Sequence, residues 1–197
     1  MRRPVFALLL AAAMLFVTPL ACATVILLHV NLLGSNEVPP TTSTGTGFAS
    51  LVLDTTADTL TGHITFSGLT GITTASHIHC CLSSPFLGGV NVGVATVVPA
   101  FPGFPIGVTS GTDDFVLDLG SASSYNPAFI TAQGSLATAE AALIAGLRDG
   151  ETYLNIHTNV SPGGEIRGFV VPEPMTTSLL VLGLAAATFI SRRRRRI

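Results

Sequence analysis

The sequence predicts an all-β protein that folds as a single antiparallel β-sandwich with one short helix. Short apolar runs alternate with polar residues at the period of a strand, as in Leu60–Phe66, where Leu60, Ile64 and Phe66 alternate with threonine and histidine. Clusters of Gly, Pro, Asn and Asp separate these runs. Helical spacing occurs in one segment of the central region, so the βαβ alternation of a parallel sheet is absent.

Each run with strand character is short and is bounded by turn residues. The predicted strands are Val25–Leu33, Gly47–Asp54, Leu60–Phe66, Thr73–Cys81, Val90–Val98, Asp114–Leu119, Glu151–Thr158 and Glu165–Val171. The segment Asn126–Leu147 is predicted to be the helix, with Thr138 as its N-cap and Gly146 and Gly150 as stop signals.

The N-terminus has the charge and apolar pattern of a secretory signal peptide. Residues 1–23 carry Arg2 and Arg3, then an apolar run and small residues before the expected cleavage at Thr24. A lipoprotein signal through Cys22 is the alternative, but Pro19 stands where such signals carry Leu. We therefore expect an N-terminal signal helix, followed by one domain at residues 24–170.

The C-terminus, residues 171–197, has the pattern of a membrane segment. An apolar run of 16 residues, 175–190, is expected to form a transmembrane helix of about 24 Å at roughly 1.5 Å per residue. This length is slightly short for a hydrocarbon core of about 30 Å. The run ends in Arg192, Arg193, Arg194, Arg195 and Arg196, which should stay cytoplasmic and leave the domain outside.

The domain between these two ends is acidic. It holds Arg148 and Arg167 against ten acidic residues, a net charge of −8, and the chain contains no lysine. Phosphate contacts need basic side chains, so nucleic-acid binding is excluded. Cys80 and Cys81 are adjacent and remain after signal cleavage; they could pair with each other, pair between chains or bind metal.

Three histidines are expected on one polar face of the sheet. His77 and His79 share a strand face because Ile78 points the other way, and His157 follows the same rule in its own strand. If these strands are neighbours, the three imidazoles, with Glu165 as a fourth ligand or an orienting group, predict a zinc or copper site. The alternative is a polar face in which Arg167 pairs with Glu165. No motif of a catalytic nucleophile is present, so the chain is not expected to be an enzyme.

Motifs spread over the central domain resemble the CHRD (chordin-like) domain. They are Leu33–Pro40, Thr44–Gly47, Ile64–Leu69, His77–His79, Tyr153–Thr158 and Pro162–Gly168. The resemblance implies a secreted all-β domain without an established enzymatic activity. The His-x-His strand and the Gly-Gly-x-x-Arg-Gly end are also similar to copper/zinc superoxide dismutase, which uses more histidine ligands than three. An immunoglobulin-like or superoxide-dismutase-like sandwich is therefore expected.

The tail resembles the PEP-CTERM sorting signal of Gram-negative bacteria that produce exopolysaccharide. The match consists of Val171, Pro172, Glu173 and Pro174, then the apolar run and the arginine block. The resemblance implies an exosortase-type processing enzyme as a partner, with delivery from the inner membrane to the cell surface or extracellular matrix. A permanent anchor is the alternative. The leading expectation is an exported, non-enzymatic β-module whose partners are the membrane and exopolysaccharide or other surface proteins.

Overall fold

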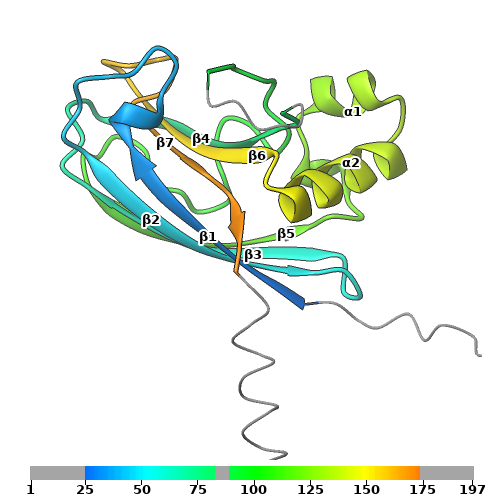
Figure 1. The fold of residues 1–197 in the computed structure, drawn as a ribbon. Coiled ribbons are helices and arrows are strands. Elements are labelled where there is room, and N and C mark those ends of the chain that lie inside the picture. The colour runs from blue at the N-terminus through cyan, green and yellow to red at the C-terminus, as the bar shows by residue number, and fades with distance from the viewer. Residues whose placement is uncertain (1–24, 83–88, 174–197) are drawn as a thin grey trace, which may run out of the picture.

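The structure is a computed structural model that describes residues 25–82 and 89–173. Within these residues, eight strands form one antiparallel sheet in the order β4-β6-β7-β1-β2-β3-β5, with β8 paired to β1. The strands are β1 (Val25–Leu33), β2 (Thr46–Asp54), β3 (Thr59–Ser67), β4 (Thr73–Cys80), β5 (Gly111–Asp118), β6 (Thr152–Thr158), β7 (Ile166–Phe169) and β8 (Val171–Pro172). The sheet curls into a half-barrel (Figure 1). The predicted all-β class is confirmed, although one continuous sheet makes both walls of the sandwich.

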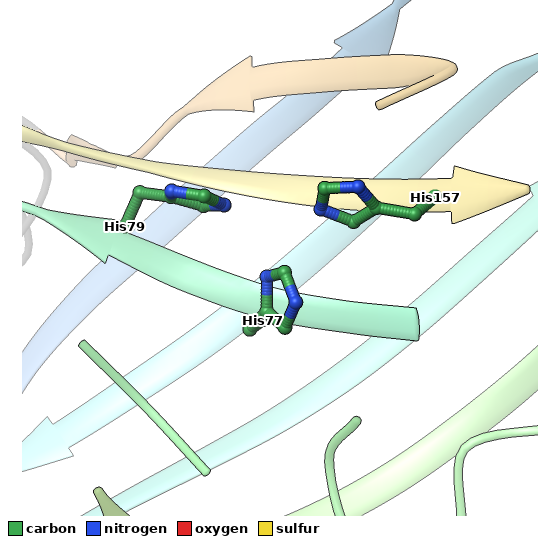
Figure 2. A group of neighbouring side chains, drawn as sticks. All are labelled: His77, His79 and His157. Atoms are coloured by element: carbon green, nitrogen blue, oxygen red, sulfur yellow. The ribbon is translucent and has the colours of Figure 1, made fainter. Parts of the chain in front are cut away.

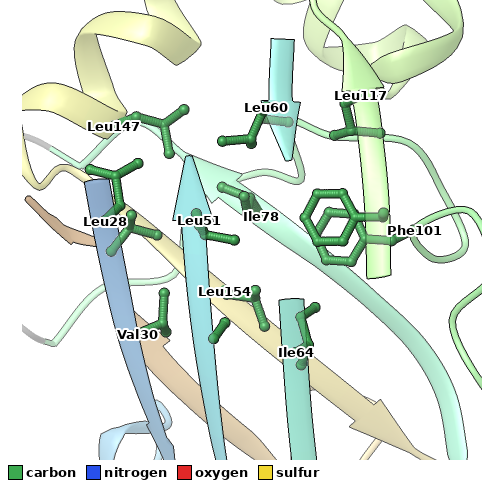
Figure 3. Close-up of a cluster of buried hydrophobic side chains, with 14 of the residues drawn as sticks. Leu28, Val30, Leu51, Leu60, Ile64, Ile78, Phe101, Leu117, Leu147 and Leu154 are labelled. Carbon is green, nitrogen blue, oxygen red and sulfur yellow. The ribbon is translucent and has the colours of Figure 1, made fainter. Parts of the chain in front are cut away.

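Alternation of apolar residues places the core on the inner face of the curled sheet. Leu28, Leu51, Ile64 and Leu154 are almost fully buried there, although they come from four different strands (Figure 3). Leu143 and Leu147 of α2 (Leu136–Asp149) close one side of this core. Burying each such side chain contributes about 1.5–3 kcal/mol, so the core is what holds the two walls together.

The predicted single helix is two helices. The first, α1 (Pro127–Gln133), ends at Gly134, whose φ of 91° is left-handed. Ser135 is the N-cap of α2. Thr138, the predicted N-cap, is the N3 residue, and its side chain completes the capping box with Ser135. Gly146 does not stop α2, because the helix continues to Asp149 and ends at Gly150.

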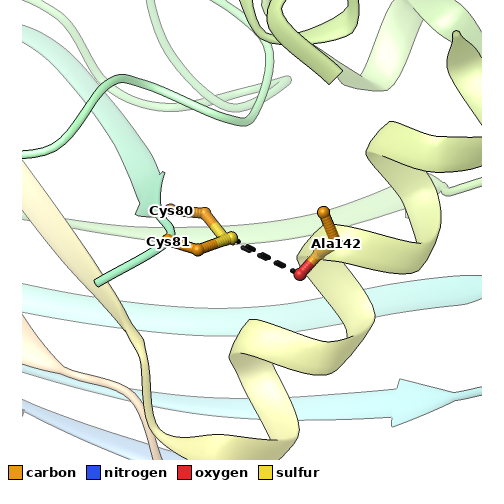
Figure 4. Close-up of a disulfide and its surroundings, with 3 residues drawn as sticks. All are labelled: Cys80, Cys81 and Ala142. Carbon is orange, nitrogen blue, oxygen red and sulfur yellow. Dashed lines mark hydrogen bonds between the residues drawn. A yellow bond between two sulfur atoms is a disulfide. The ribbon is translucent and has the colours of Figure 1, made fainter. Parts of the chain in front are cut away.

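Gly146 is instead a point of close contact between α2 and the end of β4. A Cβ atom there would lie 2.8 Å from Sγ of Cys80. Cys80 and Cys81 are joined by a disulfide, and both sulfur atoms lie within 3.7 Å of the Ala142 carbonyl (Figure 4). The sequence allowed a bond between the two cysteines, a bond to another chain or metal binding. The structure has the bond between Cys80 and Cys81, so neither sulfur is a free thiolate that could bind metal.

The segment Val90–Val98 is not a continuous strand as predicted. It meets its neighbours through isolated bridges, such as His79 with Val94. Ala95 and Thr96 both donate their backbone N–H to the carbonyl of Ile78, which breaks the regular ladder. The segment therefore runs along the edge of β4 without adding a full strand. This irregular path brings the carbonyl of Val92 to within 2.7 Å of Nδ1 of His79.

Candidate metal centre

His77, His79 and His157 come together on the face of the sheet opposite the core (Figure 2). His77 and His79 lie on β4, and His157 lies on the neighbouring strand β6. Ala75 pairs with His157 and His77 pairs with Asn155, so the three imidazoles occupy adjacent positions of one antiparallel ladder. The pairing of β4 with β6 supplies the neighbouring strands that the sequence pattern required.

The three imidazoles are close enough to share one ion. The ring centroid of His77 lies 5.1 Å from that of His79 and 4.6 Å from that of His157. One nitrogen from each ring falls within 4.8 Å of the others, and this is the one such group of three metal-binding side chains among the described residues. A zinc ion between these nitrogens would bind each of them at roughly 2.0–2.1 Å.

Hydrogen bonds from the protein fix the orientation of two of the rings. Nδ1 of His79 donates to the Val92 carbonyl at 2.7 Å, and Nδ1 of His157 donates to the Pro162 carbonyl at 2.9 Å. A carbonyl oxygen only accepts, so each Nδ1 carries the proton and each Nε2 carries a lone pair. This arrangement is the usual one for histidines that bind metal through Nε2.

One ring nitrogen of each of the three histidines has no hydrogen-bond partner within the protein. Nε2 of His79, Nε2 of His157 and Nδ1 of His77 are all buried and make no hydrogen bond. Leaving a buried polar atom unpaired costs about 1–3 kcal/mol, so three at one place call for a common explanation. A shared cation would satisfy all three nitrogens at once, with His77 carrying its proton on Nε2.

Burial keeps these imidazoles neutral. Burial, helped by the neighbouring imidazoles, lowers the pKa of His77 to about 3. Burial also lowers the pKa of His79 to about 4, against the effect of its hydrogen bond to the Val92 carbonyl and with a smaller contribution from His157 and Arg167. The pKa of His157 is lowered as well, mainly by burial and against the effect of the Pro162 carbonyl. The neutral form is the one that binds metal, so at pH 7 no proton has to be displaced.

Glu165 does not join the histidines. Its carboxylate accepts hydrogen bonds from Ser43 and Thr158, both at 2.6 Å, and from the backbone of Thr70 and Gly71. Although burial raises the pKa of Glu165, these hydrogen bonds lower it overall. Glu165 precedes β7 in a turn, where the alternation of a strand no longer decides the direction of its side chain. The expected fourth ligand is thus engaged elsewhere, holding loops together.

Arg167 pairs with Glu37 and not with Glu165. Its Nε lies 3.4 Å from a carboxylate oxygen of Glu37, and both side chains are at most 3% exposed. Burial raises the pKa of Glu37 to about 7, against the effect of Arg167. The sequence did not single out Glu37, because it sits in an irregular stretch next to prolines whose burial has no pattern. The two loops that carry Glu37 and Asn91 cover a face that the sequence predicted to be exposed.

Part of the predicted sorting signal lies on the sheet. Val171 and Pro172 form β8 against β1, and Glu173 donates its backbone N–H to the carbonyl of Leu27 at 2.9 Å. The signal helix, the helix at 175–190, Pro174 and the arginine block lie outside the described residues. In the described part, no single helix is long and apolar enough to cross a membrane; α1 and α2 reach that length only as a pair bent by 96°.

Comparison with known proteins identifies one family for the sequence that forms this sheet and carries the three histidines. No curated protein and no solved structure is similar enough to count as a match. The CHRD domain family matches residues 28–170, which takes in most of β1, all of β2 to β7 and all three histidines. This match covers most of the chain and confirms the resemblance noted from the motifs. The chain therefore belongs to the CHRD domain family.

Proposed function

We propose that this protein is an exported, non-enzymatic CHRD module that binds one zinc or copper ion through His77, His79 and His157. One observation carries the metal-binding role: three neutral imidazoles, two of them buried and His157 half-buried, bring nitrogens within 4.8 Å of one another, and each has a buried nitrogen without a hydrogen bond. Imidazole suits both zinc and copper, and the disulfide removes the thiolates that would favour softer ions. Three protein ligands leave one coordination position for water or a partner group.

The export part of the proposal is supported by the two ends of the sequence and by family membership. In this proposal the chain crosses the inner membrane, is held by the C-terminal helix with the domain outside, and passes to the surface or matrix after exosortase-type cleavage. Its surface partners there are exopolysaccharide or other surface proteins. Intact masses of the protein from membrane and secreted fractions decide this part, and a full-length mass found only in the cytoplasm would contradict it.

Metal loading tests the binding role directly. The full-length chain, purified without a polyhistidine tag and stripped with a chelator, is incubated with zinc or copper and freed of excess metal. We expect close to one ion per chain by elemental mass spectrometry. A His29→Ala, His63→Ala double variant is the matched control, because these two histidines lie outside the cluster and should not change the stoichiometry. Less than about one-tenth of an ion per chain would refute the binding role.

A further inference from the structure

We propose that Asn91 and Arg167 are positioning residues for His79 and act on it through the carbonyl of Val92. The proposal rests on the metal-binding role above and concerns side chains that belong to no ligand set. It is carried by the contacts of the segment Val90–Val92, which lies over the polar face of β4, β6 and β7.

Val92 is the direct partner of the ligand. Its carbonyl accepts from Nδ1 of His79 at 2.7 Å and from the hydroxyl of Tyr153 at 3.3 Å. Its backbone N–H in turn lies 3.2 Å from the same hydroxyl oxygen. The position of the Val92 backbone thus decides which nitrogen of His79 carries the proton and where the ring points.

Asn91 and Arg167 hold the residues that precede Val92. Nη1 of Arg167 donates to Oδ1 of Asn91 at 3.1 Å and reaches the Val90 carbonyl at 3.5 Å. The amide of Asn91 donates to the Val38 carbonyl at 2.9 Å, which ties the segment to the loop that carries Glu37. Segment Val90–Val92 is not part of a regular strand, so these contacts hold it on one side, while the Gly93 carbonyl, which accepts from the backbone N–H of Cys80 at 3.2 Å, holds the next residue to β4.

Arg167 is itself firmly placed. Its side chain is 1% exposed, its Nε donates to the Asn36 carbonyl at 2.8 Å, and Glu37 balances its charge. Tyr153 connects the two ends of this system, because its ring stacks on His79 at 4.5 Å and lies 4.4 Å from the guanidinium carbon of Arg167. The Arg167 guanidinium is therefore connected to His79 in two ways. One runs through Asn91 and the Val92 backbone, and the other through the Tyr153 ring, which contacts both side chains.

Groups that hydrogen-bond a ligating histidine typically change metal affinity by about 10–100-fold, because they fix the tautomer and the orientation of the ligand. Asn91 acts on His79 through the Val92 carbonyl, so its effect should lie at the lower end of this range. The effect should fall on affinity and leave stoichiometry intact, since Asn91 contributes no ligand atom. It should also be visible without metal, as a loss of the single Nδ1-protonated form of His79.

The test compares Asn91→Ala with Asn126→Ala in the full-length chain. The side-chain Oδ1 of Asn126 also accepts one hydrogen bond from the backbone, the N–H of Ala128 at the start of α1, so this variant controls for the loss of an amide. With zinc as the probe, Asn91→Ala should bind one ion about 10-fold more weakly than wild type, and Asn126→Ala should bind like wild type. Asn91→Asp, which keeps an oxygen for Arg167, should recover most of the affinity.

Nitrogen NMR of ¹⁵N-histidine-labelled, metal-free protein supplies the second readout. Wild type should show His79 protonated at Nδ1, and Asn91→Ala should show a mixture of tautomers. If Asn91→Ala proves unstable, Tyr153→Phe, which keeps the ring and loses the hydroxyl, should show the same two changes more weakly. Unchanged affinity together with an unchanged tautomer would overturn the proposal. Failure of wild type to bind zinc would instead refute the metal-binding role, while the NMR result would still decide the positioning of His79.

Discussion

Replacing His157 with alanine should weaken zinc binding by more than about 100-fold. Loss of an outer partner alone costs about 10–100-fold, and this change removes one of only three protein ligands. His157 is partly exposed at the end of β6, so the core packing of the strand survives the substitution. Competition of the full-length chain with a fluorescent zinc chelator measures the change.

The matched control for this prediction is His63→Ala. His63 is also a strand histidine with a hydrogen-bonded Nδ1, 2.7 Å from Asp114, but it is half-exposed and outside the cluster. It should leave zinc affinity as in wild type. Equal affinities of the His157→Ala and His63→Ala variants would mean that the third ligand has been assigned to the wrong residue.

The second large effect is a loss of stability in mild acid that depends on the buried histidines. In the unfolded chain a histidine titrates near 6.5, whereas in the fold burial lowers the pKa of His77 to about 3. Between these values the unfolded state binds a proton that the folded state does not, so the free energy of unfolding falls as pH falls. Each such histidine contributes about 1.4 kcal/mol per pH unit over this window.

Glu37 acts in the opposite direction and has to be separated from the histidines. Its pKa is raised to about 7, so on acidification from pH 7 towards 4.5 the folded state takes up a proton first and gains stability. Comparing wild type with His77→Leu cancels this contribution, because Glu37 is present in both. In metal-free urea titrations, wild type should lose about 1.4 kcal/mol of unfolding free energy relative to His77→Leu for each unit by which the pH falls between 6.5 and 4. Parallel stability curves would show that His77 is not held neutral by the fold.

Strand alternation was enough to predict the central feature of the candidate site. His77 and His79 flank Ile78, and the side chain of Ile78 has to enter the core, so the imidazoles share the other face. The same rule placed His157 opposite Leu154 and Ile156. Whether β4 and β6 are neighbours is a long-range pairing that local alternation does not encode, and the structure supplied it.

Features that depend on loops were not predicted, because local alternation does not encode the conformation or the contacts of a loop. Gly134 ends α1 and Ser135 starts α2 within two residues, which interrupts an otherwise continuous helical pattern. Glu165 lies just outside a strand, so its direction follows its hydrogen bonds to Ser43 and Thr158 and not the strand period. The segment that contacts His79 is held by hydrogen bonds from Arg167 to Val90 and Asn91, which lie more than 70 positions away in the chain.

X-ray absorption at the zinc edge of the loaded full-length chain tests the central claim most directly. The ligand set of His77, His79 and His157 predicts three imidazole nitrogens at about 2.0–2.1 Å, with one further light atom at the open position. Multiple scattering from imidazole rings should be present and should decrease in His157→Ala. A sulfur shell at about 2.3 Å, or a first shell of oxygen atoms without imidazole scattering, would contradict a three-histidine metal centre.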